Sequence, residues 1–118
     1  MRKEIEDRLV DFSVVIIELC DKMNKKYMEN YLTKQLLRSS ASAALNYGEA
    51  QSAETKKDFV HKTGVVLKEL RESNINLKII KKSRMIDDEA LLNKVLDESE
   101  QLVSIFYRTV QTAKANSE

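Results

Sequence analysis

The sequence predicts an all-α protein, an antiparallel up-down-up-down four-helix bundle formed by a single domain of residues 1–118. Three observations support this prediction. The chain has no proline and only two glycines, so it lacks the residues that make tight turns and sheet corners. Apolar residues recur at alternating four- and three-residue spacing, as they do on helices packed against other helices. Apolar content of 42% and charged content of 33% are typical of an ordered protein with one core.

The first predicted helix covers residues 3–25. Its apolar seam consists of Ile5, Leu9, Phe12, Ile16, Leu19 and Met23. Val14 and Ile17 extend the apolar surface to another side, so we expect this helix to contact two neighbours or a partner subunit. Residues 26–30 form the predicted link, and Asn30 is the expected N-cap of the second helix because its amide oxygen can accept from an unpaired N–H of the first turn.

The second predicted helix, residues 31–52, is built largely from small side chains. Residues 39–44 are all serine or alanine, which lets neighbouring helices approach closely. Gly48 within the helix favours a close approach by a neighbour or a local bend. The polar residues of this helix fall on one stripe: Gln35, Arg38, Ser42 and Glu49, with Asn46 beside them. On a packed face they would have to satisfy one another, whereas spacing alone leaves an exposed face equally open.

The third and fourth predicted helices repeat the four-three seam. Thr55 and Asp58 resemble a capping box at the start of the third helix, residues 56–83. Its seam is Phe59, Thr63, Val66, Leu70, Ser73, Leu77 and Ile80. The acidic residues 87–89 suit the positive end of the fourth helix, which we expect to run to residue 114 and to fray beyond it. The seam of that helix is Leu92, Val95, Ser99, Leu102, Phe106, Val110 and Ala113.

Charge is distributed unevenly although the net charge is only +1. Residues 56–84 hold nine basic and three acidic side chains, and residues 85–118 hold three basic and seven acidic ones. One interpretation is that the third and fourth helices attract each other, or that each has an ordinary solvated face. The other is a basic surface for RNA or DNA. The candidate contacts are Lys78, Lys81, Lys82 and Arg84, although cations also stabilise the C-terminus of a helix.

No catalytic constellation, metal motif or phosphate-binding loop stands out in the sequence. His61 is the one histidine and lies beside Lys62, where we expect it at the surface or at an interface. Cys20 is the one cysteine and lies in an apolar run, which indicates a buried reduced thiol. We therefore expect no enzyme activity, no metal and no cofactor. The charged N-terminus and the shortness of the apolar run 14–17 predict a cytoplasmic protein with no membrane partner.

Several segments resemble a known bacterial family. They are 35–39 (QLLRS), 46–51 (NYGEAQ), 58–62 (DFVHK) and 68–73 (KELRES). They are similar to the 23S rRNA intervening-sequence proteins, also described as the ribosomal S23 family, over about the middle third of the chain. The family often carries an Ile-x-x-Asn-Ile-Ala-Glu-Gly pattern around the asparagine. Here Ala43 takes the place of the first isoleucine, and Tyr47-Gly48 replaces the Ile-Ala pair.

The resemblance implies a four-helix protomer that assembles into a ring-shaped homo-oligomer, typically a pentamer, without enzyme activity. It also implies association with RNA or the ribosome, because genes of the family were noticed inside insertions in large-subunit ribosomal RNA genes. Arg38, Asn46 and Glu49 would then form a structural network that reaches Arg71 or Glu72 on the third helix.

Three functional hypotheses follow. The leading one is a non-enzymatic homo-oligomer that binds RNA. The alternative is a protein–protein assembly or scaffold module that binds no nucleic acid. A third is an enzyme that uses the polar cluster of the second helix, which would require an open pocket there.

Overall fold

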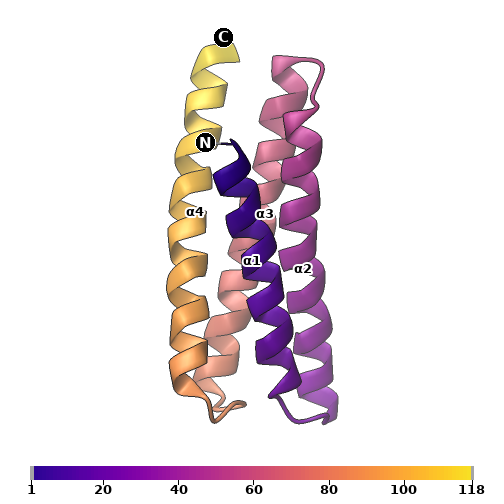
Figure 1. Ribbon diagram of the computed structural model, residues 1–118, viewed down its shortest axis with the longest axis vertical. Coiled ribbons are helices and arrows are strands. Elements are labelled where there is room, and N and C mark those ends of the chain that lie inside the picture. Colours follow the sequence, from indigo (N-terminus) through magenta and orange to yellow (C-terminus); the bar gives the residue numbers. More distant parts are fainter. Residues whose placement is uncertain (1, 118) are drawn as a thin grey trace.

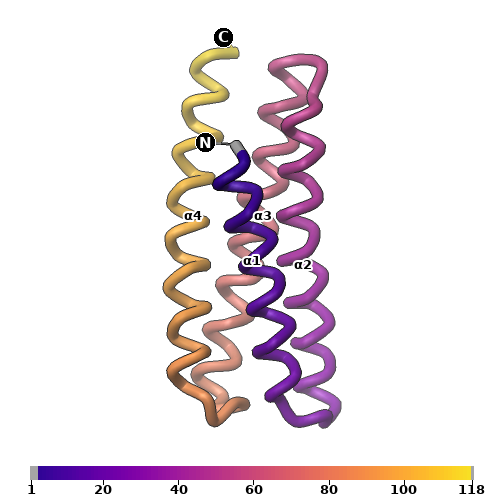
Figure 2. Tube along the Cα trace, viewed as in Figure 1, coloured from indigo at the N-terminus to yellow at the C-terminus, as the bar shows by residue number. Residues whose placement is uncertain are grey.

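Four helices follow one another along the described residues, 2–117. They are α1 (Arg2–Asp21), α2 (Tyr27–Gln51), α3 (Lys56–Lys82) and α4 (Glu89–Ser117). In the computed structural model they run alternately up and down, joined by short connections (Figures 1 and 2). α1 and α3 each pack against α2 and α4, so α1 lies diagonally opposite α3. The predicted antiparallel four-helix bundle is confirmed.

The predicted seams meet in one core along the bundle axis. In α1 all seam residues are buried except Ile5, which is partly buried against the core. The largest fully buried side chains are Phe12 and Phe106. Tyr47 of α2 meets Phe106 of α4 across the diagonal, with ring centroids 5.4 Å apart and an interplanar angle of 87°. This edge-to-face contact is the geometry that aromatic quadrupoles favour.

Among the described residues, side-chain caps are present at the starts of α3 and α4. At α3, the Thr55 hydroxyl accepts a hydrogen bond from the N–H of Asp58 at 3.0 Å, as predicted. At α4, the Asp88 carboxylate accepts from the N–H of Leu91 at 3.0 Å. The prediction for α2 is wrong, because α2 already begins at Tyr27 and Asn30 lies inside its first turn. The Asn30 amide instead donates to the carbonyl of Lys25 at 3.1 Å.

The other helix boundaries differ from the prediction by a few residues. α1 ends at Asp21, and the chain then turns so tightly that Met23 is still buried. α4 continues to Ser117, so residues 115–117 are helical rather than frayed. α3 ends at Lys82 and is followed by Arg84 at φ 54°, a left-handed conformation. The N–H of Met85 then donates to the carbonyl of Ile80 at 3.2 Å, which closes a Schellman motif without the usual glycine.

The close approach by a neighbouring helix, one of the two features predicted at Gly48, is not present in the protomer. A Cβ atom built at this position meets no other atom within 4 Å. No helix of the protomer therefore approaches Gly48 closely, and the small-residue contact of α2 lies on another side of the helix.

Candidate nucleic-acid interface

Small residues of α2 are buried, and Ser39 among them faces α3. Ser39, Ser40 and Ala43 are buried, and the Ser39 hydroxyl lies 2.6 Å from the Ser73 hydroxyl of α3. Ser73 also donates to the carbonyl of Glu69 at 3.1 Å. The buried hydroxyls are thus satisfied by each other and by the backbone, as buried polar groups must be. Their small size allows α2 and α3 to form the most extensive helix pair of the bundle.

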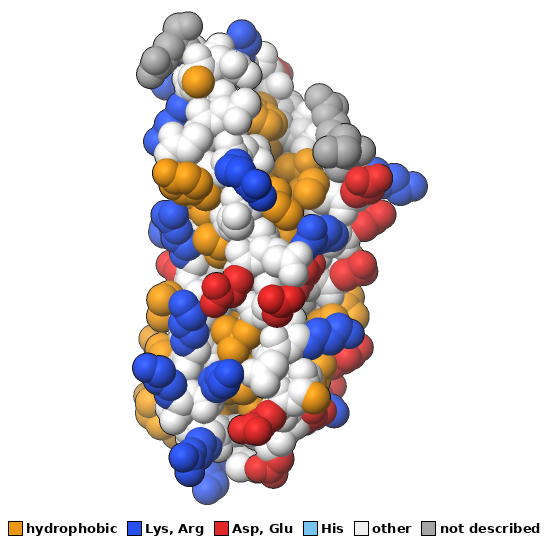
Figure 3. All heavy atoms as spheres, turned by 90° about the vertical axis from the view of Figure 1, so that its left-hand side faces the viewer, with side chains coloured by type: hydrophobic (Ala, Val, Ile, Leu, Met, Phe, Trp, Pro, Cys, Tyr) orange, Lys and Arg blue, Asp and Glu red, His pale blue; other side chains and the backbone are white. Residues whose placement is uncertain are grey.

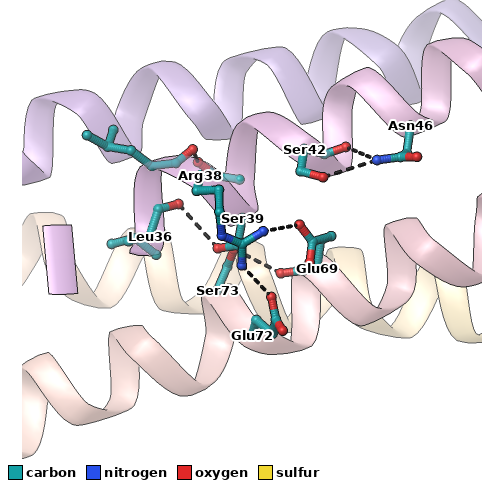
Figure 4. A network of polar contacts seen from close by, with 10 residues as sticks. Leu36, Arg38, Ser39, Ser42, Asn46, Glu69, Glu72 and Ser73 are labelled. Atoms are coloured by element: carbon teal, nitrogen blue, oxygen red, sulfur yellow. Dashed lines mark hydrogen bonds and ion pairs between the residues drawn. The ribbon is translucent and has the colours of Figure 1, made fainter. Parts of the chain in front are cut away.

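Arg38 connects α2 to two carboxylates of α3 (Figure 4). One guanidinium nitrogen lies 2.8 Å from Glu69, and the other lies 2.7 Å from Glu72. Glu69 is almost sealed, with 4% of its surface exposed, whereas about half of the Arg38 side chain remains in solvent. Hydrogen bonding with the Glu69 carboxyl, followed by that with Arg38, lowers the pKa of Glu72 from its ordinary value. The cluster therefore stabilises the α2–α3 contact.

The structure brings together only two of the six residues of the predicted network, Arg38 and Glu72. Asn46 donates to the carbonyl and the hydroxyl of Ser42, in its own helix. Glu49 forms a separate ion pair with Lys62 at 2.7 Å. Gln35 is half-buried and Arg71 is exposed, and neither has a hydrogen bond or ion pair with the described residues.

Sequence reasoning missed Glu69, the buried partner of Arg38. The sequence does indicate that Glu69 is buried, because it follows the core residue Val66 by three positions and precedes the core residue Leu70 by one. At helical spacing such a residue lies at the edge of the buried face. A carboxylate there requires a cation from a neighbouring helix.

Five cations form a line along the outer face of α3. We call this set the cationic stripe: Lys57, Lys68, Arg71, Lys78 and Lys82, all exposed. Their spacing of i, i+11, i+14, i+21 and i+25 keeps them on one side of a helix with 3.6 residues per turn, over about 38 Å. Figure 3 looks onto α4 and shows Lys and Arg side chains along the edge formed by α3. Figure 3 also shows Asp and Glu side chains gathered along the opposite edge, formed by α1.

The four predicted nucleic-acid contacts do not all lie on the cationic stripe. Lys78 and Lys82 belong to the cationic stripe. Lys81 points toward α4 and donates to the side-chain oxygen of Asn93 at 2.9 Å. Arg84 is exposed beyond the helix end, in the left-handed turn. Lys57, Lys68 and Arg71 were not predicted as contacts, although they precede Lys82 by 25, 14 and 11 residues, spacings that place them on the same side of a helix.

The acidic residues of α4 do not neutralise the cationic stripe. Between α3 and α4 one ion pair is present among the described residues, Lys78 with Glu100 at 3.9 Å, and both side chains are about half exposed. Such a surface pair contributes little. The exposed charges of α4 balance one another: Glu89, Asp97 and Glu100 against Lys94, Arg108 and Lys114. The stripe therefore presents its charge to solvent.

Other chemistry-bearing residues have ordinary surroundings. His61 is exposed on α3, and Cys20 is buried, which raises the pKa of its thiol. Among the described residues, no group of three or more His, Cys, Asp or Glu side chains could hold a metal ion. No helix within residues 2–117 is long and apolar enough to cross a membrane.

A groove of about 470 Å³ lies between α1 and α4, away from the Arg38 cluster. Its lining consists of Asp11, Phe12, Val14, Val15, Lys94, Val95, Asp97 and Glu98. Beside it, Arg8 of α1 pairs with Glu98 at 2.7 Å, and this contact raises the pKa of the Arg8 guanidinium. The hydroxyls of Ser39 and Ser73, next to the Arg38 cluster, are sealed between α2 and α3. The groove is lined by α1 and α4 and does not reach the polar residues of α2.

Comparison with known proteins agrees with this fold. The family model described as 23S rRNA-intervening sequence protein matches residues 3–108. A crystal structure of a protein with unknown function from the S23 ribosomal protein family of Bacteroides thetaiotaomicron VPI-5482 is similar, with a TM-score of 0.82. The two chains are 25% identical, and the similarity covers 94% of this chain and 99% of the other. The search of curated proteins finds no match.

Proposed function

This chain belongs to the 23S rRNA-intervening sequence protein family, and we propose that it is a non-enzymatic, homo-oligomeric cytoplasmic protein that associates with structured RNA. The pentamer implied by the family resemblance is the assembly that we propose. The RNA would be recognised through its phosphates, as a regular array of negative charge, rather than through its bases.

The observation that carries the RNA proposal is the cationic stripe. Its five side chains are exposed, and the one ion pair they form among the described residues is the 3.9 Å contact of Lys78 with Glu100, which is itself about half exposed. The two acidic residues in the middle of α3, Glu69 and Glu72, are turned toward Arg38 of α2 instead. A linear cationic surface of this kind attracts a polyanion and releases its counterions.

Filter binding to a structured RNA at low and at physiological salt tests the proposal. The variant Lys68→Glu/Arg71→Glu/Lys78→Glu removes three cations from the stripe. The affinity falls as salt rises, and each lost phosphate contact should make this slope of log K against log salt shallower by about 0.9. For three lost contacts we expect the magnitude of the slope to fall by about 3. The matched control is Lys94→Glu/Arg108→Glu/Lys114→Glu, which reverses three exposed cations of α4.

The expected result is weak binding by the stripe variant and a smaller loss in the α4 control. Equal losses in the two variants would show that net charge, not the stripe, determines the affinity. Binding that does not depend on salt would also contradict the proposal. Circular dichroism of both variants confirms that each is folded before binding is compared.

A second candidate function is an assembly or scaffold module that binds no nucleic acid. The observation in its favour is the exposed apolar surface of α1, where Val10, Val14 and Ile17 are each about half exposed. Monomeric proteins do not usually leave a contiguous apolar surface in water without a use for it. Absence of co-purifying nucleic acid in the 260/280 absorbance ratio, together with loss of partner binding in a Val14→Lys variant, would favour this function over RNA association.

A further inference from the structure

The outer face of α1 combines apolar and acidic side chains. Val10, Val14 and Ile17 are 47%, 48% and 52% exposed. Around them lie four exposed carboxylates, at i, i+4, i+11 and i+14 on the same side of the helix: Asp7, Asp11, Glu18 and Asp21. We call these seven residues the α1 face. The described helices of the same protomer leave it largely open, and only its edge at Asp11 and Val14 borders the groove toward α4.

The outer face of α3 has the same construction with the opposite charge. Ile75 and Ile79 are 55% and 43% exposed and lie beside the cationic stripe. Arg71 and Lys78 flank Ile75 in the sequence, at i−4 and i+3, and therefore adjoin it on the helix surface. We call Ile75 and Ile79, together with the adjoining Arg71 and Lys78, the α3 face. The apolar centre of each face thus has a charged border, acidic on α1 and basic on α3.

The two faces lie on opposite sides of the bundle and at similar heights. α1 and α3 are diagonal neighbours, so their outer faces point away from each other. Arg8 of α1 pairs with Glu98 of α4, and the next residue of α4, Ser99, accepts from the Asn74 amide of α3 at 2.8 Å. Arg8 and Asn74 therefore mark one level of the bundle. Directly after these two residues, the apolar part of each face begins.

We propose that the α1 face of one copy packs against the α3 face of a second copy. Both helices run in the same direction, so two parallel copies placed side by side would bring Val10, Val14 and Ile17 against Ile75 and Ile79. The acidic and basic borders would then meet as ion pairs. A contact between two different faces leaves one of each free, so it repeats from copy to copy, and it closes into a ring when each copy is also rotated relative to the last.

This inference rests on the homo-oligomer of the proposed function and identifies its interface. The interface and the RNA proposal compete for Arg71 and Lys78, because stripe residues that a second copy covers are not available to phosphates. Like-charge repulsion would oppose the alternative contacts, α1 face to α1 face and α3 face to α3 face.

Charge exchange between the faces tests the proposal without RNA. Sedimentation velocity would measure the molar mass of Asp11→Lys/Glu18→Lys, of Arg71→Glu/Lys78→Glu, and of a chain carrying all four changes. Each double variant should sediment at lower mass than the wild type. The fourfold variant, and an equal mixture of the two double variants, should recover a higher mass because opposite charges meet again. Lys94→Glu/Arg108→Glu on α4 is the control and should keep the wild-type mass.

Each result has a separate meaning, provided that circular dichroism shows folded variants. A wild-type oligomer that both double variants leave intact overturns the proposed interface, while the homo-oligomer of the proposed function still holds. Double variants that dissociate without recovery in the fourfold variant and in the mixture also overturn the interface. A wild-type protein that is monomeric at micromolar concentration overturns both. Loss of RNA binding alone contradicts only the RNA proposal, since these measurements contain no RNA.

Discussion

Replacing Arg38 with methionine should lower the free energy of unfolding by about 2 kcal/mol. The change leaves the Glu69 carboxylate, of which 4% is exposed, without its cation. Breaking a fully buried ion pair costs about 3–5 kcal/mol, because the remaining charge is desolvated and unpaired. Here the estimate is lower because about half of the Arg38 side chain is in solvent, which screens the pair.

The assay is urea unfolding followed by circular dichroism at one fixed protein concentration, which removes mass-action effects of any assembly. For an m-value of about 1.5 kcal/mol/M, a loss of about 2 kcal/mol moves the midpoint by about 1.3 M urea. The matched control is Glu72→Gln. Glu72 is more exposed than Glu69, so its loss should cost less than about 1 kcal/mol.

The double variant Arg38→Met/Glu69→Met provides the decisive comparison. Removing both charges exchanges a buried ion pair for apolar contact, which is often neutral in other proteins. The double variant should therefore lie within about 1 kcal/mol of the wild type and above Arg38→Met alone. Two results would refute the reasoning: Arg38→Met with wild-type stability, or a double variant as unstable as the single one.

Three further predictions concern sites outside this cluster. Arg84→Gly should stabilise the protein by about 0.5–1 kcal/mol in the same urea assay, because glycine adopts the left-handed φ of 54° without steric cost; lower stability would contradict this. Cys20 should react with a thiol reagent such as DTNB only after urea unfolding, since burial both hides the thiol and raises its pKa; rapid labelling of the folded protein would disprove it. Hydrogen bonding to Lys22, followed by that to the N–H of Leu91, lowers the pKa of Asp88 in the folded state. The contribution of Asp88 to stability is therefore present above its unfolded pKa of about 3.9, and it is lost as the pH falls through the lower folded value. In Asp88→Asn, acid unfolding curves should therefore depend less steeply on pH below about 4, and an unchanged dependence would argue against the pair.

The fold could be predicted from the sequence because all the seams carry the same pattern. Apolar spacing of four and three residues fixes which side of each helix is buried, whatever the neighbours are. The start of α2 could not be located in this way. Lys26 precedes this helix without a side-chain cap, so Asn30 four residues later was the stronger capping candidate in the sequence.

The ion pairs and exposed cations of the candidate interface were less predictable, because they depend on how each helix is rotated about its own axis. Glu69 and Arg71 are two positions apart, which turns their side chains about 200° away from each other on a helix. A charged residue in this part of α3 can therefore lie either inside the α2–α3 contact or on the outer face, and a shift of two positions decides which. The same rotation separates Lys81, which reaches Asn93 of α4, from Lys82, which remains on the outer face.

The weak packing of α1 against α4 has a consequence for the dynamics of the bundle. This contact is the least extensive of the four between neighbouring helices, and the groove beside Val14 and Val15 interrupts it. Arg8 with Glu98 and Gln101 near the start of α1, and Lys22 with Asp88 at its other end, are polar links that hold it. Amide hydrogens of α1 should therefore exchange with deuterium through a partial opening in which α1 separates while α2 and α3 stay paired. In that opened form the core residues Leu9 and Phe12 would reach solvent before those shared by α2 and α3.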